Sequence, residues 1–293
     1  MVLEVNYQGS KGTHLPLYYN INQPPPGLGT VAQKQALRPY PQFGNINFLD
    51  AAGNSSYHGL LSKLQQRYSN GLSFLASYAW GKSVDDSPGT PYNVVPSRSA
   101  AMNPHNFQLE RGLSGFDIRH RFVFSPVYEL PFGPGRKYAS GNRYAGWVVG
   151  GWEISGIMSM QTGRPFTVLV STDNANVLGN VDRPNVIGNT NAGPHTVQQW
   201  INVNAFQLAP AGTFGNEGRN AVMGPGLVNL DVSLSRVFKV SERLAIQFRA
   251  ESFNVVNHPN FDQPSQTFGV AGFGSITAAE APRQIQFAAK VRF

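Results

Sequence analysis

The sequence predicts an all-β protein: about eight antiparallel strands of an up-and-down barrel that crosses a membrane. Three observations predict this class. Several segments alternate between apolar and polar residues, which is the period of a β-strand. The links between these segments alternate between short and long, as expected where turns lie on one side of a membrane and loops on the other. Charged residues make up only 13% of the 293 residues, whereas soluble domains average about 25%.

Composition excludes several other classes of protein. No stretch approaches the roughly 18 consecutive apolar residues of a membrane helix, and 41% hydrophobic residues are too many for a disordered chain. The chain has no cysteine, so disulfides and thiolate metal sites are excluded. The net charge is +7, but the basic residues are scattered along the sequence, so nucleic-acid binding is not expected.

The first six expected strands follow one another with one apolar parity each. The second is the least regular, because Leu61 shares the polar parity with Lys63 and Arg67. No segment predicts a convincing helix, and strand lengths of roughly seven to fourteen residues are expected. The apolar positions are Leu3, Val5, Tyr7; Leu60, Leu64, Tyr68; Leu72, Phe74, Ala76, Tyr78, Trp80; Phe122, Phe124, Tyr128, Leu130; Trp152, Ile154, Met158, Met160; and Leu230, Val232, Leu234, Phe238.

The last two strands, from Leu244 and over 283–293, show the clearest alternation. In a membrane barrel the apolar parity faces lipid and the polar parity faces the lumen. The residues expected to face lipid are Leu244, Ile246, Phe248, Ile285, Phe287 and Val291. The residues expected to face the lumen are Gln247, Arg249, Glu251, Gln284, Gln286, Lys290 and Arg292.

The links give a consistent topology if the chain ends at the periplasmic rim. Short turns are then expected on the periplasmic side and long loops on the outer side. The inner links are 69–71, 131–146 and 240–242, and the outer loops are 9–56, 83–117, 163–228 and 257–282. Aromatic residues then gather near the two interfaces: Tyr68, Trp152, Phe238 and Phe293, with Leu72, at the inner one, and Tyr78 and Trp80 toward the outer one.

Alternation alone leaves a second class open. A soluble β-sandwich with one buried face alternates in the same way. Lipid offers no hydrogen-bond partner to the backbone, so only helices and closed barrels cross it. With no apolar helix in the sequence, the alternating links and the terminal aromatic residue favour the barrel.

Several motifs together resemble the C-terminal barrel of Oar-like TonB-dependent outer-membrane transporters of the acidobacterial type. The similarity covers essentially the whole chain, and its motifs are specific in combination. They are Arg119-His120-Arg121-Phe122-Val123, Glu129-Leu130-Pro131-Phe132-Gly133, Gly150-Gly151-Trp152-Glu153-Ile154-Ser155-Gly156, Thr213-Phe214-Gly215-Asn216, Gly218-Arg219-Asn220, Gly224-Pro225-Gly226, Phe248-Arg249-Ala250-Glu251-Ser252-Phe253-Asn254 and Asn257-His258-Pro259-Asn260-Phe261.

The resemblance implies a larger protein than this chain. Such transporters have a barrel of about 22 strands, an N-terminal plug and a drive from the TonB complex through that plug. Residues 1–293 have room for about eight strands, so we expect them to form the C-terminal portion of one transmembrane barrel domain, as an open curved sheet without plug or signal peptide. The alternating Phe287, Val291 and Phe293 resemble the signal read by the outer-membrane barrel assembly machinery.

The location and partners expected from the resemblance follow directly. The protein belongs in the outer membrane of a Gram-negative bacterium, where it would take up or export a solute. Its partners would be outer-membrane lipid, the missing plug and barrel strands, the TonB complex through that plug, and the assembly machinery. The loops carry no readable code for the solute.

No enzyme, cofactor or metal site is expected. The six histidines are far apart and lack metal-binding spacing, and no segment suggests a nucleophile with an oriented base. The oxygen-rich segment 173–176 leaves calcium in a loop open. Two alternatives to the transporter remain: a small closed porin-like barrel of these eight strands, and a secreted β-sandwich that binds carbohydrate.

Overall fold

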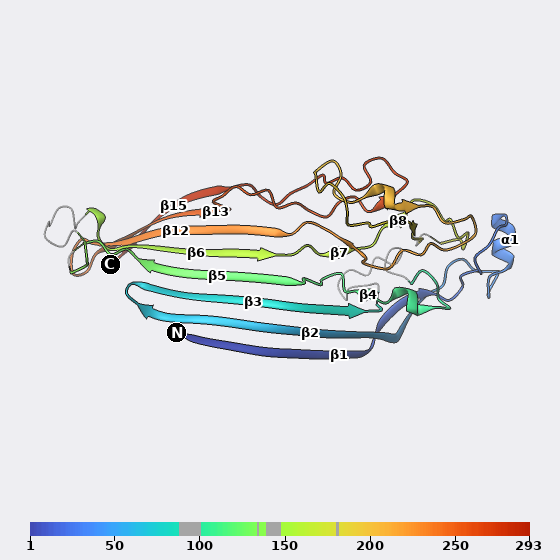
Figure 1. Cartoon of the computed structure of the whole chain (residues 1–293), viewed down its shortest axis with the longest axis horizontal. Helices are drawn as coiled ribbons and strands as arrows, with labels where there is room; N and C mark the ends of the chain where they lie inside the picture. Colours follow the sequence, from blue (N-terminus) through green and yellow to red (C-terminus); the bar gives the residue numbers. More distant parts are fainter. Residues whose placement is uncertain (88–100, 134, 139–147, 180–181) are drawn as a thin grey trace.

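Eight long strands form one antiparallel sheet in which each strand pairs with its neighbours along the chain (Figure 1). The computed structural model describes residues 1–87, 101–133, 135–138, 148–179 and 182–293. The strands are β1 (Val2–Asn20), β2 (Asn47–Ser69), β3 (Leu72–Asp85), β5 (His120–Glu129), β6 (Trp152–Gln161), β12 (Leu227–Lys239), β13 (Ala245–Phe253) and β15 (Gln284–Arg292). A two-residue strand, β4 (Gly112–Leu113), adds to the end of β3. The predicted all-β, up-and-down order is confirmed.

The sheet is open. Within the part of the chain that the structure describes, β1 pairs only with β2, and β15 pairs only with β13. Figure 1 places both chain termini at the same end of the sheet, where the short links lie. The remaining sheets have two strands each, so these residues do not form the second layer that a β-sandwich needs.

The register keeps one face of the sheet apolar. In β13 and β15, Ile246 lies opposite Val291 and Ala250 lies opposite Phe287. Further along the sheet, Phe122 lies between Tyr78 of β3 and Met160 of β6. A shift by one residue would move every side chain of a strand to the other face. The alternation in the sequence therefore becomes one continuous apolar face and one polar face.

The link between β2 and β3 is a two-residue hairpin. Ser69 pairs with Leu72, and Asn70 and Gly71 have φ of 52° and 85°, as the Asn-Gly turn of a twisted hairpin requires. A Cβ added at Gly71 would lie 2.8 Å from the Glu129 carbonyl oxygen. The link between β12 and β13 is slightly longer than expected: Leu244 belongs to the turn, where its carbonyl accepts a hydrogen bond from the Val240 N–H at 2.9 Å. Much of the third inner link lies outside the described residues.

The first outer loop is shorter than predicted. β1 continues to Asn20 and β2 begins at Asn47, which leaves 21–46 as the loop. The polar residues of these extensions resemble a loop in sequence, but they pair with each other, with register shifts on either side of Leu15. The prediction of strands no longer than about fourteen residues was therefore wrong for β1 and β2, which have 19 and 23 residues.

The long loops fold into a packed body rather than extended polar loops. We call residues 101–119, 162–179, 182–226 and 254–283 the loop unit. Its two-stranded sheets pair β7 (Pro165–Phe166) with β11 (Val222–Met223), β8 (Leu169–Val170) with β14 (Thr267–Phe268), and β9 (Asn185–Val186) with β10 (Phe206–Gln207). Its core consists of Phe166, Val168, Ile201, Ala205, Phe206 and Val222, with Phe268 and Phe273 packed against it.

Short helical turns occur where no helix was expected. The helix α1 (Val31–Ala36) is capped at its N-terminus by Thr30. The Thr30 hydroxyl accepts the Gln33 N–H, and the Gln33 side chain accepts the Thr30 N–H. This reciprocal capping compensates for the shortness of the helix. Two 3₁₀ turns, at Phe107–Glu110 and Val203–Ala205, lie in the loop unit. Among the described residues, no helix has the length and apolar character needed to span a membrane.

Candidate functional site

The polar face of the sheet carries an open groove of about 470 Å³. Its walls come from β5, β6, β12 and β13, and its charged residues include Glu153, Asp231, Arg249 and Glu251. The Arg249 guanidinium lies 3.4 Å from the Glu251 carboxylate. Serines 155, 233 and 235 add hydroxyl groups. A groove of this composition offers hydrogen-bond donors and acceptors to a polar solute or to a polar protein surface.

The residues expected to face a lumen are brought together on this face. Gln247 lies opposite Lys290, Glu251 opposite Gln286, and the others share their parity. The Gln286 amide donates to Glu251 at 2.5 Å, and the Arg292 guanidinium donates to Gln247 at 2.8 Å. Side-chain hydrogen bonds therefore join the polar positions of β13 and β15 at two places along the strand pair.

The residues expected to face lipid lie on the other face, except for Leu244 in the turn. Ile285, Phe287 and Val291 of β15 are 61%, 72% and 53% exposed. The rings of Phe248 and Phe287 stack with centroids 6.3 Å apart. A contiguous exposed apolar surface of this kind requires an apolar environment.

Aromatic side chains gather at the end of this face where the short links lie. The Trp152 ring packs edge-on against Phe238 and Phe248, with centroids 6.3 and 6.1 Å away. The Arg236 guanidinium lies 4.3 Å from the centroid of Phe238 and donates to the Val148 carbonyl at 2.6 Å. Such a belt suits the boundary between apolar and aqueous surroundings. Phe293, proposed as part of an assembly signal with Phe287 and Val291, directly follows β15 and is fully exposed.

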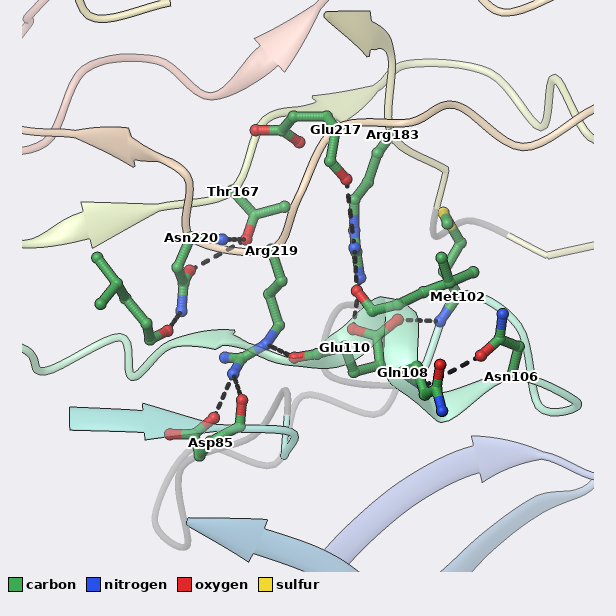
Figure 2. A network of polar contacts seen from close by, with 12 residues as sticks. Asp85, Met102, Asn106, Gln108, Glu110, Thr167, Arg183, Glu217, Arg219 and Asn220 are labelled. Carbon is green, nitrogen blue, oxygen red and sulfur yellow. Dashed lines mark hydrogen bonds and ion pairs between the residues drawn. The ribbon is translucent and has the colours of Figure 1, made fainter. Parts of the chain in front are cut away.

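A buried network of charges joins the outer end of β3 to the loop unit (Figure 2). The Arg219 guanidinium forms an ion pair with Asp85 and also donates to the carbonyls of Asp85, at 2.6 Å, and Glu110, at 2.5 Å. The Glu110 carboxylate forms an ion pair with Arg183 and accepts the Met102 N–H at 3.0 Å. All four charged side chains are nearly inaccessible to solvent, so each charge depends on its partner.

Asn220 continues this network toward β4. Its side-chain amide donates to the Leu113 carbonyl at 2.6 Å, and its backbone N–H donates to the Thr167 hydroxyl at 2.9 Å. Its φ of 53° lies in the left-handed region that asparagine tolerates better than most residues. Gly112 is required beside Arg219, because a Cβ there would lie 2.2 Å from the Arg219 carbonyl oxygen.

Two buried carboxyl groups of the loop unit keep their protons to a higher pH than exposed carboxyl groups do. Burial raises the pKa of Glu217 to about 8 and the pKa of Asp182 to about 6. One Glu217 oxygen accepts the Val168 N–H at 3.2 Å. The other has no hydrogen-bond partner among the described residues. Glu217 is therefore largely neutral at pH 7.

Asp85 and Glu110 hold separate parts of the chain together through their ion pairs with Arg219 and Arg183. The sequence alone identified neither Arg183 nor the function of Arg219. Arg219 is 134 positions from Asp85 in the chain, so no local pattern could have paired them. Among the described residues, no three His, Asp or Glu side chains are grouped closely enough to hold a metal ion.

Comparison with known proteins identifies the family. Residues 1–286 match the model of a family described as an outer membrane beta barrel domain. Among solved structures, the outer membrane transporter YddB from Escherichia coli is similar with a TM-score of 0.45 and 10% identity, over 99% of this chain and 30% of that one. No curated protein matches. The protein is thus located in the outer membrane of a Gram-negative bacterium, and the chain belongs to the outer membrane beta barrel domain family.

Proposed function

We propose that this chain is the C-terminal portion of the barrel of an Oar-like, TonB-dependent transporter, which moves a solute across the outer membrane without catalysing a reaction. The observation that carries the proposal is the open sheet. β1 and β15 each leave one side of the backbone unpaired among the described residues, and lipid cannot hydrogen-bond to such edges. Further strands must therefore complete the wall, and a barrel of about 22 strands would do so.

The two faces support the same interpretation. The polar face, with the 470 Å³ groove, would line the lumen, and the apolar face would meet lipid. In this arrangement Arg249, Glu251 and Lys290 lie in water or against a plug, whereas Phe248 and Phe287 contact acyl chains. Residues 1–293 would then form a single wall segment rather than a separate domain.

The loop unit would meet the solute first, because long loops lie on the outer side of such barrels. Energy from the TonB complex would reach the barrel through a plug supplied by the rest of the protein. Phe293, Phe287 and Val291 would direct the chain to the barrel assembly machinery. These parts of the proposal rest on the resemblance noted in the sequence.

A small closed barrel is the alternative. Eight strands can close, but the interior would then be filled by side chains and would leave no path for a solute. The observed sheet does not bring β1 to β15, which disfavours this arrangement.

Disulfide trapping in outer membranes tests the proposal, because the sequence contains no cysteine of its own. Cysteines would be placed pairwise at 3, 5 or 7 in β1 and at 285, 287 or 289 in β15 of the full-length protein. We expect no cross-link in any pair. The matched positive control is a cysteine pair at Ala250 and Phe287, which lie opposite each other in β13 and β15 and should cross-link efficiently.

A β1 to β15 cross-link in correctly folded protein would instead show a closed small barrel and overturn the proposal. The same preparations allow TonB dependence to be examined separately. The full-length protein should bind the purified periplasmic domain of TonB, whereas an outer-membrane porin should not. Absence of binding with the sheet still open would reject the TonB part alone.

A further inference from the structure

Four exposed basic residues lie on the apolar face, at the end of the sheet nearest the loop unit. They are Lys11, His58, Lys82 and His120, and they come from four neighbouring strands, β1, β2, β3 and β5 (Figure 1). We call them the basic rim. The register gives their face directly. Lys82 and Trp80 have the same parity in β3 as the apolar residues Tyr78 and Phe74. His58 lies opposite Lys82, and His120 lies opposite Trp80, so both histidines are on that face.

The rim follows a line that a membrane surface would follow across tilted strands. Lys11 lies opposite Ser56, and His58 is two residues further from the loop unit. Lys82 lies opposite His58, and His120 lies opposite Trp80, again two residues further from the loop unit. Barrel strands tilt by roughly 35 to 45°, so a plane parallel to the membrane crosses successive strands at stepped positions of this kind.

Aromatic residues lie directly below the rim. The Tyr7 hydroxyl is hydrogen-bonded to Nδ1 of His58 at 2.6 Å, and the Tyr78 hydroxyl is hydrogen-bonded to Nδ1 of His120 at 2.7 Å. Both ring pairs stack, with centroids 6.2 and 6.1 Å apart. Tyrosine and tryptophan favour the boundary between acyl chains and headgroups, so these pairs, with exposed Trp80, set the depth at which the rim lies.

In the rim strands, the acidic residues Glu4, Asp85 and Glu129 have the opposite parity. Asp86, directly after β3, has the parity of Lys82, and its carboxylate accepts the backbone N–H and the side-chain amide of Asn54. Among the described residues, the ammonium groups of Lys11 and Lys82 form no ion pair. By contrast, Lys63 on the polar face lies 3.7 Å from the Glu4 carboxylate. Two unneutralised lysines at the boundary of an apolar surface favour an anionic ligand.

We propose that the basic rim binds phosphate groups of anionic lipid in the outer leaflet. The inference rests on the orientation given under the proposed function, in which the loop unit lies outside the cell. Lysine binds phosphate as a mobile point charge, and its apolar stem lies along the sheet while the ammonium reaches the headgroups. The tyrosine hydroxyls hold the two histidine rings in the same rim through Nδ1.

The test is binding of lipopolysaccharide, the phosphorylated glycolipid of the outer leaflet, to the delipidated full-length protein in neutral detergent. The rim variant K11Q/K82Q should bind at least tenfold more weakly than the unaltered protein. The control variant K63Q/K290Q loses the same charge from the polar face and should stay within twofold. Heat-modifiable migration in gels would confirm that both variants are folded. If the double variant fails to fold, the single variants K11Q and K82Q would be tested in its place.

Three results would overturn the proposal. The first is a folded rim variant that binds as tightly as the unaltered protein. The second is a control variant that loses as much binding as the rim variant, which would indicate a general charge effect. The third is displacement of the lipid by inorganic phosphate at equal concentration, which would assign the rim to free anions. None of these results depends on the β1 to β15 cross-link, so the failure of this inference and that of the transporter proposal are distinguishable.

Discussion

Arg219 is the residue on which the position of the loop unit depends most. Arg219 binds Asp85 at the end of β3 and the backbone of Glu110, so one side chain joins the sheet to two loops. Replacing one partner of a buried ion pair leaves the other charge uncompensated, which typically costs about 3 to 5 kcal/mol.

We therefore expect Arg219→Met to destabilise the loop unit by about that amount. External protease added to intact outer membranes should cut the loop unit of this variant far faster than that of the unaltered protein. The control is Lys63→Met, which breaks the exposed pair with Glu4 and should leave the cutting rate unchanged. Equal protection of the two variants would contradict the bridging function of Arg219.

Glu217 makes the stability of the loop unit depend on pH. Its pKa is about 8 in the folded chain, against an ordinary value of 4.5, so the folded state holds the proton more tightly. The contribution of Glu217 to stability is therefore fully present below pH 4.5, falls as the pH rises through the interval up to about 8, and is level above it. Asp182, with a pKa of about 6, adds to the fall in the lower part of the interval.

The neutral variant Glu217→Gln should flatten this dependence between pH 6 and about 8. The measurement is the urea midpoint of the loop unit at each pH. Unfolding is monitored by the fluorescence of Trp200 in a protein whose barrel tryptophans are changed to phenylalanine. Glu242→Gln, in the turn at the other end of the sheet, is the control and should keep the full slope. A slope that Glu217→Gln leaves unaltered would exclude this carboxyl as its origin.

At the level of the elements, β13 and β15 offer the most direct measurement of which face meets lipid. Arginine in place of Phe287 should destabilise the full-length protein in lipid vesicles by about 2 to 4 kcal/mol if that position lies near the bilayer midplane. Arginine in place of Gln286, the residue directly before Phe287, should have a small effect because position 286 lies on the polar face. Denaturant midpoints in vesicles would compare the two, and equal tolerance would contradict the assignment of the faces.

Sequence was sufficient for the strands but not for their ends. The parity of Phe248 and Phe287 follows from local alternation, and the Asn70-Gly71 turn follows from the φ angles that such a hairpin needs. The extensions of β1 and β2 were missed because polar residues such as Lys11 and Ser56 pair across the hairpin without an alternating apolar pattern to reveal them. Helix α1 was missed because six residues carry no readable period.

At the level of the whole molecule, the difference between sheet and loop unit has a physical cause. The sheet depends on pairs between strands adjacent in the chain. The loop unit depends on contacts such as Arg183 with Glu110 and Phe206 with Phe273, which join separate loops. The first kind leaves a pattern in one segment, and the second does not. The strands, which form the barrel domain of the family, can therefore be predicted from local sequence patterns. The packing of the loops cannot.

The meander order of the main strands also determines how such a wall can change in evolution. Among the described residues, every main strand is hydrogen-bonded only to the strands next to it in chain order, so duplication or loss of one hairpin alters no ladder elsewhere. The circumference of the wall can thus change in steps of two strands while each remaining strand keeps its partners. A change of circumference of this kind needs no new residue in the strands that stay, and the long loops can diversify independently of the number of hairpins.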